Sequence, residues 1–258
     1  GINSNVYRRL AYDEIFSHLL IMSKNRKKVK KYKKKPKNLK KLISRKIINS
    51  LPFQLTESQK KVIDEIENDL KSKERMFRVV QGDVGSGKTI VALLTATNVI
   101  ESKFQCAFMA PTEILAKQHF ELAKKIFKNI KINVALITGK TEHSKKKEIL
   151  KNLKDNKINL IIGTHSLFQK KIEFNKLGFI IIDEQHKFGV KQRMNLAKKG
   201  GCECDVLLMS ATPIPRTLTM SIYGDMDVSI IREKPNHRKE IKTYSKLENK
   251  IIDVINYV

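Results

Sequence analysis

Residues 82–89 read G-D-V-G-S-G-K-T and match the pattern G-x-x-x-x-G-K-[ST]. A glycine-rich loop of this spacing can turn its backbone N–H groups inward, and a helix that starts there adds partial positive charge. Such a loop cradles phosphates, with the lysine on the β- and γ-phosphates and the threonine hydroxyl on Mg²⁺. The sequence therefore predicts binding of a nucleoside triphosphate and Mg²⁺ by Gly82, Asp83, Val84, Gly85, Ser86, Gly87, Lys88 and Thr89.

Two adjacent carboxylates, Asp183 and Glu184, end the apolar run 179–182. Neighbouring residues on a strand point in opposite directions, so the two acids should have different roles. Downstream of a phosphate loop, Asp183 would join Thr89 in holding Mg²⁺, and Glu184 would orient and polarise the attacking water. The pair therefore predicts a hydrolase.

The elements that must position these groups alternate between strands and helices from residue 51 onward. Uninterrupted Val, Ile and Leu runs indicate strands covered on both faces. The fold class is therefore α/β, a doubly wound and mostly parallel sheet with its ligand at the carboxyl ends of the strands. The expected strands are 77–80, 107–110, 134–137, 160–163, 179–182 and 206–210, and the expected helices are 58–72, 90–101, 113–126, 144–154 and 190–198.

The chain ahead of this domain has a different composition. Apolar residues at helical spacing predict one amphipathic helix within 1–22. The segment 23–50 is a basic connector, rich in lysine from Lys24 to Lys46 and without an acidic residue as far as Lys46. Charge runs of this kind are typical of a solvated, mobile segment, and DNA contact is an equally weighted alternative.

The charge balance indicates a polyanionic partner. The 258 residues include 52 Lys and Arg against 26 Asp and Glu, a formal net charge of +26. A field of this size favours nucleic acid, with a membrane surface as the alternative. No apolar stretch approaches the roughly 20 residues of a membrane span. The three cysteines suit neither a disulfide framework nor a zinc site, so a cytoplasmic protein without a membrane partner is expected.

Further blocks carry a resemblance to a known family. The ordered set Gln59, 82–89, 110–112, 183–186 and 210–212 resembles the motor core of superfamily 2 helicases. Longer blocks resemble the RecG family of bacterial branch-migration DNA helicases over roughly residues 51–245: 52–59, 109–119, 163–167, 183–193, 211–218 and 223–229.

This resemblance implies a RecA-like ATP-binding lobe at 51–245 in a DNA helicase that remodels stalled forks and Holliday junctions. It also implies a monomeric bacterial motor whose partner is branched DNA. The helix at 1–22 resembles the family's link from its wedge domain to its motor, and 246–258 would begin the linker to a second lobe outside the chain. Lys187 departs from the family's usual arginine, which keeps the charge but loses the planar fork.

Residue roles follow from the same resemblance. Gln59 would read the adenine edge, and the catalytic set would be Lys88, Asp183, Glu184 and His186. Loops that would hold a DNA strand contain Pro111, Thr112, Thr138, Gly139, Gly163, Thr164 and His165. Gln185, His186, Ser210 and Thr212 would couple γ-phosphate sensing to DNA movement.

Three alternatives stay open at this point. The related transcription–repair coupling translocase shares the block 211–218, but it usually has Asp-Glu-Glu-Gln where this chain has Asp-Glu-Gln-His at 183–186. The chain could instead be a stand-alone, nucleotide-dependent DNA-binding module. A phosphate-loop kinase is the least favoured class, because the block 210–212 has no use there.

Overall fold

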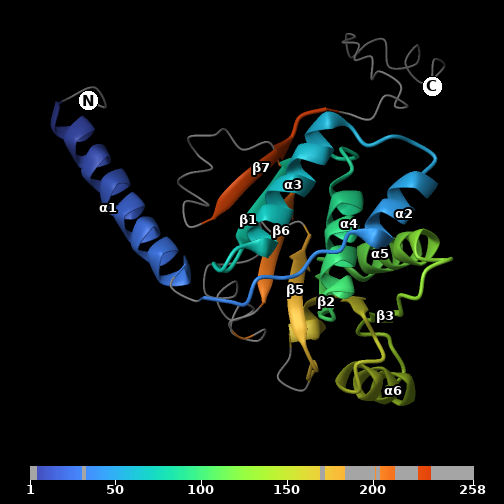
Figure 1. The fold of residues 1–258 in the computed structure, drawn as a ribbon. Helices are drawn as coiled ribbons and strands as arrows, with labels where there is room; N and C mark the ends of the chain where they lie inside the picture. The colour runs from blue at the N-terminus through green and yellow to red at the C-terminus, as the bar shows by residue number, and fades with distance from the viewer. Residues whose placement is uncertain are drawn as a thin grey trace, which may run out of the picture.

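A seven-stranded sheet in which all pairs of neighbouring strands are parallel forms the centre of the computed structural model (Figure 1). The structure describes residues 5–30, 33–168, 172–183, 201, 204–212 and 226–233. The strand order is β3-β4-β2-β5-β6-β1-β7. The strands are β1 (Phe77–Gly82), β2 (Gln105–Met109), β3 (Val134–Ile137), β4 (Leu160–Gly163), β5 (Leu177–Ile182), β6 (Asp205–Ser210) and β7 (Asp227–Ile231).

Both faces of the sheet are covered, as the apolar runs predicted. On β1 and β2, alternate residues enter two separate cores: Val80 and Phe108 pack in one, Val79 and Ala107 in the other. The first core includes residues of α2 (Leu42–Ser50), α3 (Glu57–Lys71), α4 (Lys88–Glu101) and α5 (Glu113–Ile126). The second includes residues of α6 (His143–Lys154) and the short helix η1 (His165–Phe168). The α/β, doubly wound fold is therefore confirmed.

The six expected strands are present, and β7 is an additional strand that was not predicted. Among the strands that the structure describes it pairs only with β1, at one edge of the sheet. Its sequence, Asp-Val-Ser-Ile-Ile, is half-buried at its first two residues and exposed at Ile230. An edge strand of this kind lacks the continuous apolar run by which the inner strands were found.

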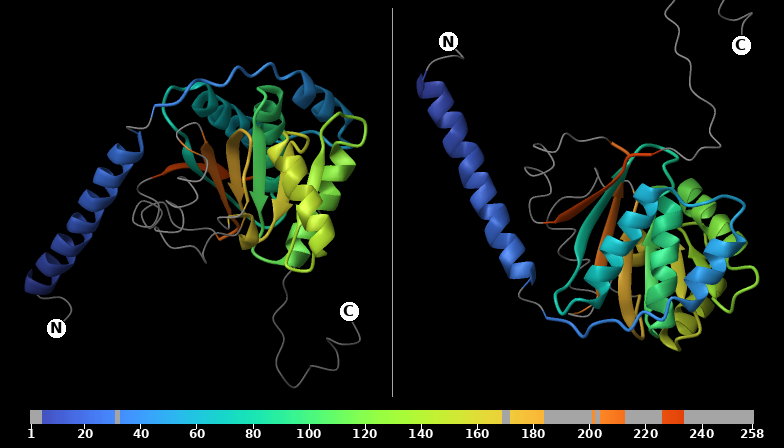
Figure 2. Two further views of the ribbon diagram at one scale, coloured as in Figure 1. Left: turned by 90° about the horizontal axis from the view of Figure 1, so that it is seen from below. Right: turned by 45° about the horizontal axis from the view of Figure 1, so that its top comes forward.

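The first helix is longer than expected. It spans α1 (Asn5–Lys30) instead of ending near residue 22. Lysine and arginine are good helix formers, so the start of the basic run continues the helix. Figures 1 and 2 show α1 projecting away from the lobe, and apolar side chains such as Leu10 and Tyr12 are exposed on it. In the described part of the chain, no helix is both long and apolar enough to cross a membrane.

The basic connector is not a solvated segment throughout. Residues 33–41, here called the basic strap, run along the lobe to α2 (Figure 2). The backbone N–H groups of Lys34 and Lys37 donate to Lys73 O at 2.8 Å and to Leu70 O at 3.0 Å. Helix α2 then packs on α4 through side chains such as the buried Ile47.

Two lysines of the basic strap are buried because of one carboxylate. The Nζ atoms of Lys34 and Lys37 lie 2.8 and 2.6 Å from Oδ2 of Asp205, and all three side chains are 0% exposed. Asp205 begins β6 at the amino end of the strand. The prediction of a solvated connector is therefore wrong for residues 33–50, which belong to the packed lobe. The helix expected at 190–198 and the segment 246–258 lie outside the described residues.

Candidate functional site

The glycine-rich loop lies between β1 and α4, as predicted. Gly85 and Gly87 have φ values of +77° and +86°, a left-handed conformation that favours glycine. Gly87 is the N-cap of α4, so the first N–H groups of that helix open toward the loop. A helix N-terminus at a glycine turn is a general site for phosphate groups.

The interior of the loop carries polar groups that suit a phosphate chain. The buried Lys88 ammonium donates to Gly82 O at 2.6 Å and to Asp83 O at 2.9 Å. The Ser86 hydroxyl is buried and has no hydrogen-bond partner among the described residues. A Cβ added at Gly82 would come within 2.6 Å of that hydroxyl. A glycine backbone without side chains, the buried ammonium group of Lys88 and the unpaired hydroxyl of Ser86 together fit the triphosphate of a nucleotide.

Gln59 contacts this loop from α3 and is only 2% exposed. Its Oε1 accepts from the N–H of Thr56 in a capping box, and its Nε2 donates to Ser86 O at 2.8 Å. One donor and one acceptor position of the amide remain for a ligand. Gln59 is therefore a buried residue of the nucleotide loop's surroundings, and its adenine-reading role stays a prediction.

Glu233, which follows β7, completes this end of α3. Its carboxylate accepts from the backbone N–H and the hydroxyl of Ser58, both at 3.1 Å. The hydrogen bond from the Ser58 N–H holds the pKa of Glu233 below its usual range. The edge strand that the sequence did not indicate therefore helps to anchor the helix that carries Gln59.

Asp183 follows β5 at its carboxyl end and is buried. Its N–H donates to Met109 O at 2.9 Å, which ties its backbone to β2. Strand β6 lies between β5 and β1, and the three strands are parallel. Asp183 and the glycine-rich loop therefore both lie at the carboxyl ends of the strands. Thr89, the second residue of α4, is half-buried at the loop. Glu184, Gln185 and His186 lie outside the described residues.

The loops expected to hold DNA follow three neighbouring strands, β3, β4 and β2. Thr112 is the N-cap of α5 and its hydroxyl accepts from the N–H of Leu115. A Cβ at Gly139 would lie 3.0 Å from Glu113 in the first turn of that helix, so the first two loops touch. Gly163 O accepts from the N–H of Ala110, and this hydrogen bond joins the loop after β4 to the loop after β2. The predicted residues in this row are Pro111, Thr112, Thr138, Gly139, Gly163, Thr164 and His165.

The predicted coupling residues that the structure describes lie between the glycine-rich loop and the loops expected to hold DNA. Ser210 ends β6, and its hydroxyl lies 2.9 Å from that of Thr212. Gln81 on β1, directly ahead of the glycine-rich loop, donates to Thr212 O at 2.7 Å. The turn after β6 is therefore joined by a hydrogen bond to the strand that carries the nucleotide loop.

Sequence reasoning gave no role to Gln81 or His119, although both contact predicted site residues. His119 lies 2.7 Å from Asp183. A signal for it existed: Ala116, His119 and Ala123 follow one another at helical spacing, and all three are buried. A histidine on the buried face of a helix must find a polar partner inside the fold. The order of the strands decides which polar group lies beside this face of the helix, and therefore which partner the histidine has.

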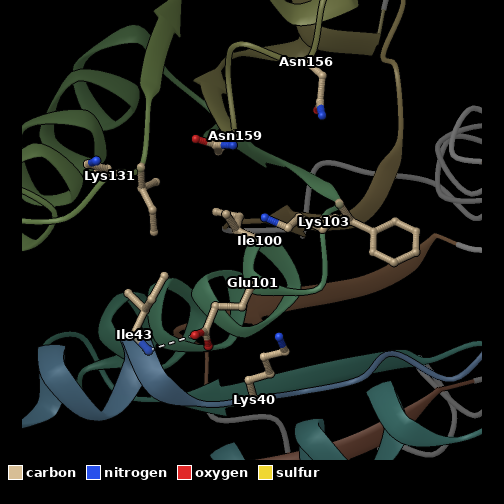
Figure 3. A pocket seen from close by; sticks show the side chains of 10 residues that line it. Lys40, Ile43, Ile100, Glu101, Lys103, Lys131, Asn156 and Asn159 are labelled. Carbon is tan, nitrogen blue, oxygen red and sulfur yellow. Dashed lines mark hydrogen bonds between the residues drawn. The ribbon is translucent and has the colours of Figure 1, made fainter.

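A cavity of about 470 Å³ lies away from this site (Figure 3). Lys103, Ile132 and Asn159 line it, and they precede β2, β3 and β4. Figure 3 shows Glu101 in its wall, where the carboxylate accepts from the N–H of Ile43 at 3.0 Å. The cavity is therefore at the amino ends of the strands, whereas the nucleotide loop follows the carboxyl end of β1.

Comparison with known proteins agrees with this geometry. The family described as DEAD/DEAH box helicase matches residues 56–221. The chain is 49% identical to the ATP-dependent DNA helicase RecG of Aquifex aeolicus, over 92% of this chain and 30% of that protein. It is 46% identical to RecG of Thermotoga maritima, over 97% of this chain and 32% of that protein.

A solved structure of RecG bound to a three-way DNA junction is also similar. Its TM-score is 0.87 at 42% sequence identity, over 97% of this chain and 34% of that chain. The chain thus spans about a third of the length of these relatives. The phosphate loop, the parallel sheet and these matches agree. The chain belongs to the DEAD/DEAH box helicase family and is homologous to RecG helicases over about a third of their length.

Proposed function

We propose that this chain is the first motor lobe of an ATP-dependent DNA translocase that branch-migrates stalled forks and Holliday junctions. One observation carries the proposal: the phosphate loop and the row of DNA-type loops share the carboxyl edge of a single sheet. The nucleotide half follows β1 and the DNA half follows β2, β3 and β4. Asp183 and Ser210 lie at the carboxyl ends of β5 and β6, the two strands between these halves.

The residues of the nucleotide half would divide the work of hydrolysis. Bound MgATP would supply the γ-phosphoryl group that is transferred to water and the cation that neutralises its charge. Lys88 and the N–H groups at the start of α4 would hold phosphate oxygens. Thr89 and Asp183 would hold the cation, and Glu184 would orient the water. The remaining donor and acceptor of Gln59 would recognise the adenine edge.

The residues of the DNA half suit contacts to the sugar–phosphate backbone. Short loops with threonine hydroxyls and exposed glycine, such as Gly139, can approach phosphates and position a strand without reading its sequence. The net charge of +26 supports the same class of partner. The related RecG structure contains a three-way junction, which supports branched DNA as the substrate.

The test uses the complete gene product with ATP and a synthetic three-way junction. Lys88→Ala should lower junction-stimulated hydrolysis by about 10²–10³-fold, the usual cost of one preorganised charge-stabilising group. Junction binding in a gel-shift assay should stay near wild type, because Lys88 faces the phosphate loop. Glu184→Gln should still bind nucleotide and lose about 10²–10⁴-fold in hydrolysis, as expected for a lost general base.

Lys151→Ala is the matched control, since it removes one exposed lysine in the last turn of α6, at the opposite end of that helix from the loop at Gly139. It should change neither hydrolysis nor junction binding. Wild-type hydrolysis by the Lys88→Ala protein would refute the nucleotide assignment. Hydrolysis that no DNA stimulates would refute the assignment as a DNA motor.

A further inference from the structure

His119 contacts the carboxylate that the proposed function assigns to the cation. Its Nε2 lies 2.7 Å from Oδ2 of Asp183, and both side chains are about 10% exposed. An ionised carboxylate can only accept, so the imidazole N–H is the donor. The bond engages Oδ2 and leaves Oδ1 as the oxygen with which Asp183 would approach a cation.

The imidazole is itself held in place. Its ring stacks on Phe108 of β2, with a centroid distance of 4.6 Å and an angle of 28°. Helix α5 brings it there on the same buried face as Ala116 and Ala123. The N–H of Asp183 donates to Met109, the neighbour of Phe108 in β2. Strand β2 and helix α5 therefore hold Asp183 by its backbone and by its side chain at once.

We propose that His119 is a positioning residue that orients the Asp183 carboxylate for Mg²⁺. The inference rests on the proposed function, because it concerns the cation that accompanies ATP. A carboxylate that accepts no hydrogen bond from the protein can rotate among rotamers. Binding of a cation must then order the side chain, which weakens the binding. Partners of this kind fix metal ligands, and their loss costs about 10–100-fold in metal affinity or activity.

A histidine with only a packing role would behave differently. Its replacement would lower the unfolding temperature and leave the Mg²⁺ dependence of nucleotide binding unchanged. A positioning histidine must alter the Mg²⁺ dependence, and a side chain that keeps the N–H donor must restore it. Glutamine and methionine are a matched pair here, because both are long and unbranched but only glutamine carries an N–H.

The experiment titrates MgCl₂ into the complete gene product with mant-AMPPNP, a fluorescent non-hydrolysable ATP analogue. His119→Met should raise the Mg²⁺ concentration of half-maximal binding by about 10–100-fold. His119→Gln should remain near the wild-type value. In EDTA the three proteins should bind the analogue equally, because no cation is then present to be positioned.

Two further measurements complete the test. In an Asp183→Asn background, His119→Met should cause no additional shift, because the carboxylate through which it acts is gone. If His119→Met does not fold, His119→Asn, whose amide is too short to reach Asp183, takes its place. An unshifted His119→Met, or equal shifts in the methionine and glutamine proteins, would overturn the inference. Wild-type protein that binds the analogue without any Mg²⁺ dependence would overturn the proposed cation site and this inference with it.

Discussion

The buried ion cluster of the basic strap makes Asp205→Asn the most informative test of the fold. Oδ2 of Asp205 accepts from Lys34 and Lys37, and Oδ1 accepts from the N–H of Met76 at 2.7 Å. Asparagine has the same shape and can still accept from Met76. The substitution therefore removes the negative charge from two buried ammonium groups and changes little else.

The size of the effect follows from this geometry. Removing one partner of a buried ion pair costs about 3–5 kcal/mol. Lys34 keeps hydrogen bonds to Asp69 O at 3.1 Å and Leu70 O at 2.9 Å. Burial also lowers the pKa of Lys34, so without the carboxylate this lysine can lose its proton, which limits the cost. We therefore expect the lower end, about 3 kcal/mol, or a fall of about 6–12 °C in the unfolding midpoint.

Thermal unfolding followed by circular dichroism measures this change. The fall should persist at high salt, because buried charges are screened little. Glu173→Gln is the control: Glu173 pairs with Lys154 at 2.8 Å, but both side chains are more than 60% exposed, so the midpoint should stay unchanged. Adding Lys34→Met and Lys37→Met to the Asp205→Asn protein should recover much of the loss, because no uncompensated ammonium group is then buried.

A wild-type midpoint for Asp205→Asn would refute the reasoning. It would mean that the basic strap is not packed on the lobe in solution. The connector would then be the solvated segment that its lysine content had suggested.

Two other predictions concern exposed and buried side chains of the lobe. Replacing the exposed Lys35, Lys40 and Lys46 by glutamine should flatten the salt dependence of duplex binding. The slope of log affinity against log salt should change by about 0.9 for each of these lysines that neutralises a phosphate. An unchanged slope in fluorescence anisotropy would show that they do not bind DNA. Burial raises the pKa of the Cys106 thiol, and that of Cys204 to about 12, so both should resist iodoacetamide at pH 8 until urea unfolds the protein; mass spectrometry would show early labelling if this is wrong.

The sequence by itself determined the parts that local signals encode. The glycine spacing of 82–89 between an apolar run and a helical stretch predicted the phosphate loop, and the structure has that strand, turn and helix. Uninterrupted apolar runs predicted six of the seven strands. Five of these are inner strands, which need no polar residues because both of their faces are buried, and the sixth is the edge strand β3. The same reasoning put Asp183 at a strand end, where the carboxyl edge of the sheet makes it useful.

Only the tertiary structure decided which side chains meet. His119 and Asp183 are 64 residues apart, and Lys34 and Asp205 are 171 apart. Nothing in a run of lysines distinguishes Lys34 and Lys37 from their exposed neighbours, since residue type and local spacing are alike. The difference arises because the strand order brings the start of β6, with its buried carboxylate, beneath the basic strap. Local patterns act over a few residues, whereas the pairing of buried charges depends on the order in which strands assemble.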